Sequence, residues 1–230
     1  MSSADLGTVV VTGGASGLGA AVAEAVHDAG GTPVVLDVRP AANGFAARTV
    51  DLADTRAAEA AVEAVAGEHG DLRGVVTAAG IDACGRLDDV EPDAWERVVA
   101  VNLLGTAAVV RAALPHLERN AGRVVTVAST LGLKAVGDAT AYCASKFGVV
   151  GFTRALAAET AGRVGVTLLV PGGMRTRFFD GRPERYRPGP DARLAEPDEI
   201  ARAVVFALSR PAGVELRELV MAADTEPSWP

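Results

Sequence analysis

Short apolar runs alternate with alanine-rich amphipathic stretches along nearly the whole chain. In the short runs Val and Leu occupy consecutive positions, which is typical of strands that are buried on both faces of a parallel sheet. The longer stretches repeat their apolar residues with the spacing of a helix that covers such a sheet. The pattern therefore predicts an α/β fold, a doubly wound parallel β-sheet flanked by helices on both faces.

The predicted elements alternate regularly. Strands are expected at 8–12, 33–38, 49–52, 74–77, 123–128, 166–170 and 216–221. Helices are expected at 17–29, 55–68, 93–118, 140–160 and 197–209. The segment 175–196, rich in Arg, Pro and Gly, breaks this alternation. We interpret it as an excursion from a single domain that spans residues 1–230, a length that suits one large α/β domain.

Composition and charge narrow the class of protein. With 49% hydrophobic and 22% charged residues, the chain has the composition of an ordinary globular protein. The net charge of −7 disfavours binding to a phosphate backbone, which requires a basic face. Aromatic residues make up only 4%, so a stacking platform for single-stranded nucleic acid is also not expected. We expect no nucleic-acid partner.

The two cysteines and three histidines do not have the spacing of a metal site or a disulfide framework, so no metal is expected. Cys84 and Cys143 are interpreted as small buried or half-buried thiols. The N-terminus lacks the pattern of a signal peptide, and no uninterrupted apolar run approaches the ~20 residues needed to cross a bilayer. A cytoplasmic protein without a membrane partner is the expectation.

A glycine-rich loop, TGGASGLG at 12–19, joins the first predicted strand to the first predicted helix. The common GxGxxG spacing does not fit, whereas TGxxxGxG fits with Gly13, Gly17 and Gly19. Glycines at such a junction let the backbone turn tightly and approach a pyrophosphate at the helix N-terminus. The loop predicts dinucleotide binding, and the alternative is an ordinary strand–helix turn that happens to be rich in glycine.

Asp37 ends the second predicted strand, 18 residues after Gly19. A carboxylate at this position can accept hydrogen bonds from a ribose 2′-hydroxyl, whereas a 2′-phosphate would meet a like charge. This favours NAD over NADP. Arg39 leaves the alternative open, because its guanidinium could hold the 2′-phosphate.

Tyr142 and Lys146 form a YxxxK pair in a predicted helix, where the spacing of four places both on one face. A phenol that acts as a base near neutral pH needs its pKa lowered by roughly three units, and a nearby ammonium favours the phenolate. Ser129 follows the strand at 123–128, at the edge where parallel sheets bind ligands. Its hydroxyl could hold a carbonyl oxygen. Each feature alone also occurs in surface helices and ordinary turns.

In combination these residues resemble the short-chain dehydrogenase/reductase family. The resemblance covers residues 8–176 and rests on TGGASGLG at 12–19, Asp37, Asp51-Leu52, AAG at 78–80, VNLLG at 101–105, Ser129, YCASK at 142–146 and PGGMRT at 171–176. It implies a Rossmann-like doubly wound fold, an alcohol dehydrogenase or ketoreductase acting on CH–OH with NAD or NADP, and a homotetramer or homodimer built partly through the helices at 93–118 and 140–160.

The resemblance also implies individual roles. Tyr142 would be the catalytic acid/base, Lys146 would lower its pKa and bind the nicotinamide ribose, Ser129 would orient the carbonyl, and Asn102 would join Lys146 in a proton relay. The expected cofactor contacts are Gly13, Ser16, Gly17, Leu18, Gly19, Asp37, Asp51, Leu52, Ala79, Gly80, Tyr142, Lys146, Pro171, Gly172 and Thr176.

Two segments depart from the family pattern. The usual NNAG is replaced by TAAG at 77–80, which removes the hydrogen bonds of two Asn side chains, and the C-terminus lacks the usual glycine-rich ending. The segment 175–196 would form a lid over the substrate. Its six arginines suggest that at least one contacts an anionic group of the substrate, and the alternative is a solvated flexible loop. Lys134, the second lysine of the chain, receives no role.

The sequence therefore predicts an NAD-dependent oxidoreductase that interconverts a secondary alcohol and a ketone. An NADP-dependent ketoreductase is one alternative, and a non-catalytic dinucleotide-binding regulator is another.

Overall fold

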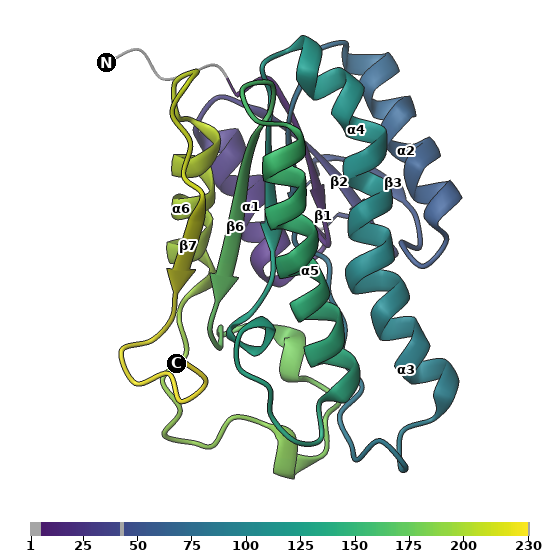
Figure 1. Cartoon of the computed structure of the whole chain (residues 1–230), viewed down its shortest axis with the longest axis vertical. Helices are drawn as coiled ribbons and strands as arrows, with labels where there is room; N and C mark the ends of the chain where they lie inside the picture. Colours follow the sequence, from purple (N-terminus) through teal and green to yellow (C-terminus); the bar gives the residue numbers. More distant parts are fainter. Residues whose placement is uncertain (1–5, 42–43, 230) are drawn as a thin grey trace.

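A single parallel sheet runs through the centre of the protein (Figure 1). The computed structural model describes residues 6–41 and 44–229. Within these ranges seven strands pair in the order β3-β2-β1-β4-β5-β6-β7. Their bounds are β1 Thr8–Thr12, β2 Thr32–Asp37, β3 Ala46–Thr49, β4 Leu72–Thr77, β5 Arg123–Val127, β6 Gly165–Pro171 and β7 Glu218–Met221. The predicted Rossmann-like doubly wound sheet is confirmed.

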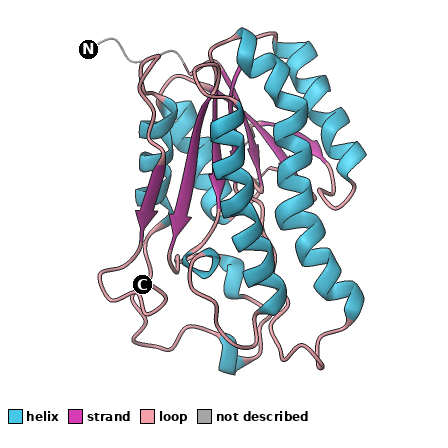
Figure 2. Cartoon of the chain, viewed as in Figure 1, coloured by secondary structure: helices cyan, strands magenta, loops and turns pink. Residues whose placement is uncertain are grey.

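Helices cover both faces of this sheet (Figure 2). Helices α1 and α6 pack together on one face, while α2 and α4 pack together on the other, where α5 also lies. The helix bounds are α1 Gly17–Asp28, α2 Thr55–His69, α3 Pro92–Val99, α4 Thr106–Arg119, α5 Thr140–Glu159 and α6 Pro197–Leu208.

The consecutive valines of β1 show why the strands are apolar at every position. Val10 packs in the core beneath α2 and α4, whereas Val9 and Val11 pack in the core beneath α1 and α6. All three side chains are completely buried. Because successive side chains of a strand point to opposite faces, a strand covered on both sides must be apolar throughout.

The third strand differs from the prediction. The predicted strand at 49–52 is wrong: strand β3 spans Ala46–Thr49, and the chain then turns at Asp51. The Asp51 carboxylate accepts a hydrogen bond from the Ala53 N–H, and its backbone carbonyl accepts one from Asp54. Strand β3 is a short edge strand with partly exposed side chains, so its sequence does not carry the apolar pattern of a buried strand.

The predicted helix at 93–118 is a continuous run in three parts. Between α3 and α4 lies a π-helical segment, Ala100–Gly105, in which the backbone is wider than in an α-helix. By length and composition the 28-residue run Pro92–Arg119 could also cross a membrane, although 56% of its most apolar window is buried inside the protein. The π-helical segment carries Asn102, one of the predicted catalytic residues.

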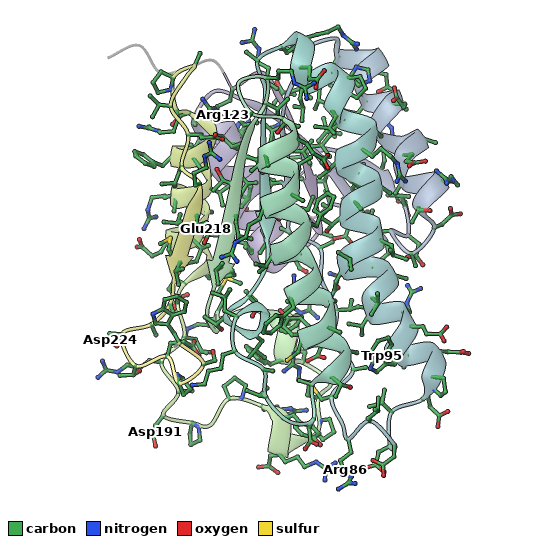
Figure 3. The ribbon with its side chains drawn as sticks, in the orientation of Figure 1. Arg86, Trp95, Arg123, Asp191, Glu218 and Asp224 are labelled. Carbon is green, nitrogen blue, oxygen red and sulfur yellow. The ribbon has the colours of Figure 1, made fainter. Side chains whose placement is uncertain are left out.

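The carboxyl ends of the strands point to one end of the molecule, where the lid (residues 175–196) and the C-terminal segment (residues 222–229) also lie (Figure 1). Figure 3 places Asp191 of the lid and Asp224 of the C-terminal segment there, with Arg123 of β5 at the opposite end. The lid leaves and rejoins the fold at an isolated bridge between Met174 and Ala195. The chain leads from β1 to β2 on one side and from β4 to β5 on the other, so the strand order reverses between β1 and β4. The carboxyl ends of the strands at this point are the expected place for a ligand.

Candidate active site

A cavity of about 880 Å³ opens at the carboxyl ends of the strands. This volume is within the range of cofactor and small-molecule sites. The residues that the sequence assigned to the cofactor all line it, together with Ser129: Gly13, Ser16, Gly17, Leu18, Gly19, Asp37, Asp51, Leu52, Ala79, Gly80, Tyr142, Lys146, Pro171, Gly172 and Thr176. Residues from across the chain are thus brought together as the spacing suggested.

The glycine loop leaves an open backbone cradle between β1 and α1. Gly13 has φ +71°, and a Cβ there would lie 2.7 Å from the Cα of Ala79. A Cβ on Gly19 would collide with the carbonyl oxygen of Gly13. Thr12 holds the neighbouring strand end in place, because its hydroxyl accepts a hydrogen bond from the Ala79 N–H at 3.1 Å. Such a cradle at a helix N-terminus fits the pyrophosphate of a dinucleotide.

Replacing Gly13 with Ala should therefore destabilise the protein and abolish cofactor binding. The left-handed φ alone costs about 1–2 kcal/mol for an L-residue, and the clash with Ala79 adds to it. Urea unfolding and the thermal shift produced by NADH would measure the two effects. Gly67→Ala is the matched control: Gly67 lies in α2, and a Cβ added there would have nothing within 4 Å, so stability should be equal or slightly higher and the NADH shift unchanged. A Gly13→Ala protein that behaved like this control would contradict the cradle.

Asp37 is buried at the end of β2 and points its carboxylate back at the loop. Its two oxygens accept hydrogen bonds from the Ala15 N–H and the Arg39 N–H, each at 3.0 Å. The guanidinium of Arg39 reaches across and donates to the Ser16 hydroxyl at 2.7 Å. The loop around Ser16 has no basic residue of its own, and Arg39, which follows β2, places one beside it.

The cavity wall next to Asp37 contains Asp51 and Leu52. Asp51 forms an ion pair at 2.9 Å with Arg97 of α3. The backbone hydrogen bond from Ala53 and the hydrogen bond from Arg97 lower the pKa of Asp51, so its carboxylate is charged at neutral pH. The predicted contact of Asp51 with an adenine stays a prediction, but the residue lies on the cavity wall as that contact requires.

Ser129, Tyr142 and Lys146 come together at the same cavity. Tyr142 lies in the first turn of α5 and Lys146 one turn later, with the ammonium nitrogen 5.6 Å from the centre of the tyrosine ring. Lys146 is only 4% exposed, and its ammonium donates to the carbonyl oxygen of Val127 at 2.8 Å. Ser129 begins a short 3₁₀ turn after β5, where its hydroxyl accepts from the Leu131 N–H.

Burial changes the acidity of both residues. It raises the pKa of the Tyr142 phenol to about 12, and a hydrogen bond with Ser129 opposes this change. Burial also lowers the pKa of the Lys146 ammonium to about 8. The predicted lowering of the phenol pKa is therefore not produced by the chain's own groups, because the cost of burying a phenolate outweighs the favourable contributions.

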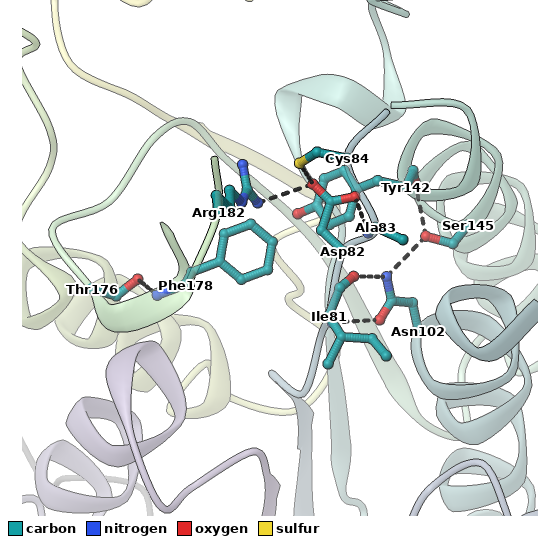
Figure 4. Close-up of polar contacts among 10 residues, drawn as sticks. All are labelled: Ile81, Asp82, Ala83, Cys84, Asn102, Tyr142, Ser145, Thr176, Phe178 and Arg182. Carbon is teal, nitrogen blue, oxygen red and sulfur yellow. Dashed lines mark hydrogen bonds and ion pairs between the residues drawn. The ribbon is translucent and has the colours of Figure 1, made fainter. Parts of the chain in front are cut away.

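Asn102 does not line the cavity. From the π-helical segment, its amide nitrogen donates to the carbonyl oxygen of Ile81 and to the Ser145 hydroxyl, and its amide oxygen accepts from the Ile81 N–H (Figure 4). Ser145 in turn donates to the backbone carbonyl of Tyr142. The side chain thus fixes the loop after β4 against the start of α5, and the predicted proton relay through Asn102 stays a prediction.

The replacement of NNAG by TAAG affects the hydrogen bonding at the end of β4. The hydroxyl of Thr77 is buried and makes no hydrogen bond with any residue in the described part of the chain. The strand end keeps its position through the bond between Thr12 and Ala79 instead. Within the described residues Thr77 therefore adds no side-chain hydrogen bond to this junction.

Most arginines of the lid are already paired within the protein, so the lid does not present six free charges. Arg177 and Arg182 line the cavity. The ion pairs join Arg175 to Glu196, Arg177 to Asp180, Arg182 to Asp82 and Arg193 to Asp224. Of the six arginines in the lid, only Arg177 and Arg182 are therefore placed to contact a substrate in the cavity.

The C-terminal segment forms a cavity wall that the sequence left undefined. Glu226 accepts a hydrogen bond from the Gly173 N–H at 2.8 Å, and the Ser228 hydroxyl bonds to Thr130 at 2.6 Å. Glu226 and Ser228 both line the cavity. Lys134, which had no predicted role, donates to the carbonyl oxygen of Pro227 at 3.2 Å and so helps to hold this segment.

Known dehydrogenases are similar to this chain in sequence and in fold. A family model described as short chain dehydrogenase matches residues 7–187. The chain is 35% identical to 2-(S)-hydroxypropyl-CoM dehydrogenase 3 of Xanthobacter autotrophicus, over 87% of this chain and 89% of the relative. It is 36% identical to D-threitol dehydrogenase of Mycolicibacterium smegmatis, over 87% and 85%. The ligand-free aldohexose dehydrogenase of Thermoplasma acidophilum shares the fold, with a TM-score of 0.85 and 24% identity over 96% of this chain and 94% of that one.

Proposed function

The chain belongs to the short-chain dehydrogenase family, and from that premise we propose that it is an NAD-dependent oxidoreductase that interconverts a secondary alcohol and a ketone. The observation that carries the proposal is that Ser129, Tyr142 and Lys146 line one cavity together with a glycine cradle suited to a dinucleotide. A dinucleotide-binding regulator without catalysis would not need these three side chains to face the same space.

Each of the three side chains has a distinct task in this reaction. Tyr142 removes the hydroxyl proton of the alcohol and returns it in the reverse direction. Ser129 donates a hydrogen bond to the carbonyl oxygen and stabilises the developing alkoxide. Lys146 adds positive charge next to the phenol. Bound NAD would supply the hydride acceptor and, when oxidised, a further positive charge near the phenol that offsets the effect of burial.

A panel of secondary alcohols and ketones, followed by the absorbance of the reduced nicotinamide, tests the activity directly. We propose a small-molecule alcohol or ketone as the substrate. An anionic group on it would find Arg177 at the cavity, where its ion pair with Asp180 is exposed, whereas Arg182 is already held by the buried Asp82. If no member of a broad panel were turned over while NAD bound tightly, the regulator would become the better proposal.

The preference for NAD rests on Asp37. Its carboxylate lines the cavity and is held in place by two backbone N–H groups, so a 2′-phosphate would approach a fixed negative charge. The second candidate, an NADP-dependent ketoreductase, is supported by the contact between Arg39 and Ser16, which brings a guanidinium to the same place.

Thermal shifts with NADH and NADPH separate these two candidates. We expect the larger shift with NADH, and we expect Asp37→Ser to reduce or reverse the difference, because it removes the charge that repels the 2′-phosphate. Arg39→Ala in the Asp37→Ser background should then weaken NADPH binding again. A larger shift with NADPH in the parent protein would favour the ketoreductase.

We also propose an oligomeric state and a cellular location for the protein. The predicted homotetramer or homodimer is supported by the exposed apolar side chains of Leu104 in the π-helical segment and Phe147 in α5, which lie in the two helical regions assigned to subunit contacts. A cytoplasmic location is supported by the composition of the chain, which is that of an ordinary globular protein.

A further inference from the structure

A carboxylate that the reaction does not require lies beside the catalytic tyrosine. Asp82 lies in the loop after β4, two residues beyond Gly80, and its side chain is only 7% exposed. One oxygen accepts from the Ala83 N–H at 2.7 Å, and the other accepts from the Cys84 thiol at 3.1 Å. Figure 4 shows Asp82 between Tyr142 and the lid. A charge buried at this position needs a partner.

The partner comes from the lid. Arg182 forms an ion pair with Asp82 at 3.0 Å and is itself only 15% exposed. Its guanidinium lies over the rings of Phe178 and Phe179, 4.6 and 4.8 Å from their centres. The Phe178 ring contacts the Tyr142 ring, with 5.6 Å between their centres. The arginine can occupy this position only while the lid covers the cavity.

The groups around the phenol come from four parts of the fold. Lys146 and Cys143 belong to α5, Ser129 follows β5, Asp82 follows β4 and Arg182 belongs to the lid. Among the charged groups, Asp82 opposes formation of a phenolate, whereas Lys146 and Arg182 favour it. Asp82 raises the pKa of Tyr142 and Arg182 lowers it, beside the larger effect of burial.

We propose that Arg182 is a positioning residue that couples lid closure to proton transfer: in the closed lid its guanidinium neutralises Asp82, the carboxylate that faces Tyr142. The proposal rests on the proposed function, since it assigns the base of that reaction its electrostatic surroundings. With the lid open, Asp82 would face Tyr142 unpaired and the phenolate would be disfavoured. The proton would therefore be transferred only after the substrate is enclosed.

A purely mechanical latch makes a different prediction from this electrostatic coupling. Breaking the ion pair from either side would open a latch and let water reach the phenol, so Asp82→Asn and Arg182→Met would both increase the phenolate fraction. Electrostatic coupling predicts opposite effects. Asp82→Asn removes the opposing charge and increases phenolate, whereas Arg182→Met leaves Asp82 unpaired and decreases it.

Absorbance of the phenolate tests this without any substrate. The chain has two tyrosines, so the difference between each protein and its Tyr142→Phe counterpart isolates Tyr142. At a fixed pH near 11, we expect about threefold more Tyr142 phenolate in Asp82→Asn and about threefold less in Arg182→Met than in the parent. At this pH a lysine has lost most of its charge, so Arg182→Lys should decrease the phenolate as Arg182→Met does. Changes in the same direction in Asp82→Asn and Arg182→Met, or no change in either, would overturn the proposal.

The pH profile of kcat/KM provides the second readout. For alcohol oxidation the rising limb should move to lower pH in Asp82→Asn and to higher pH in Arg182→Met. Arg193→Met is the matched control, because Arg193 belongs to the lid but pairs with Asp224 at the surface. Parallel losses at every pH, with no movement of the limb, would mean a structural role only. A parent without any activity would refute the proposed function, while the absorbance titration would still decide this inference.

Discussion

Turnover of a secondary alcohol is expected to fall by about 10²–10⁴-fold in Tyr142→Phe, while NAD binding is retained. The substitution removes only the hydroxyl that exchanges the proton. The aromatic ring stays, and with it the contact to Phe178, so the cavity keeps its shape. Initial rates from nicotinamide absorbance give the loss in kcat, and the thermal shift with NADH gives the binding.

Tyr186→Phe is the control for this substitution, because it removes the same hydroxyl from the other tyrosine of the chain. Tyr186 donates to Asp138 at 3.0 Å outside the catalytic group, so most of the turnover should remain. A Tyr142→Phe protein with more than a tenth of the parental kcat would show that another group is the base.

The sequence predicted the parts of the site whose residues are close together in the chain or directly follow predicted strands. The loop from Gly13 to Gly19 and the pair Tyr142 and Lys146 are each set by one strand–helix junction or one helical turn. Ser129 and Asp37 follow the ends of predicted strands, and in a parallel sheet these ends share one edge. The order of elements was enough to bring all of these residues to one cavity.

The ion pair between Asp82 and Arg182 was not predicted, because 100 residues separate its members and neither belongs to a regular element. An acid soon after Gly80 and an arginine in the lid were the available signs. They have no periodicity that would pair them. The same holds for Glu226, whose place in the cavity wall depends on how the C-terminal segment folds back.

The π-helical segment had no sequence signal either. Its residues continue the helical spacing of α3 and α4, so a single helix was the natural prediction. The wider turn shows only in the backbone, and it places Asn102 where its amide bonds Ile81 and Ser145. The prediction of strand β3 was wrong for a different reason: an exposed edge strand need not be apolar, so the apolar pattern did not mark its residues.

Burial of Tyr142 and Lys146 lowers the stability of the folded protein whenever these residues are charged. It favours the neutral form of both, while the reaction needs a phenolate next to an ammonium. A site of this kind is held in place by the surrounding fold, and its residues need not be the most stable choice at their positions. Lys146 provides a measurement of that cost.

Lys146→Met should lose most of the turnover and also change how stability depends on pH. The folded-state pKa of Lys146 is about 8, against 10.5 for an unperturbed lysine. Between these values the unfolded chain binds more protons at this residue than the folded protein does. Lys146 therefore contributes to the parent a rise in the free energy of unfolding with pH across this window, of up to about 3 kcal/mol. Met cannot titrate, so the variant lacks this rise.

Urea unfolding of both proteins without added cofactor, at several pH values from about 7 to 10.5, measures the difference. The parent should gain stability relative to Lys146→Met above pH 8, and the difference should be constant below it. Other titrating groups are common to both proteins and cancel. Lys146→Arg is the companion variant: its guanidinium keeps the charge but does not titrate in this window, so it too should lack the rise. Near-parental turnover in that variant would mean that charge alone suffices beside Tyr142, whereas its loss would show that the site requires the compact ammonium that donates to Val127.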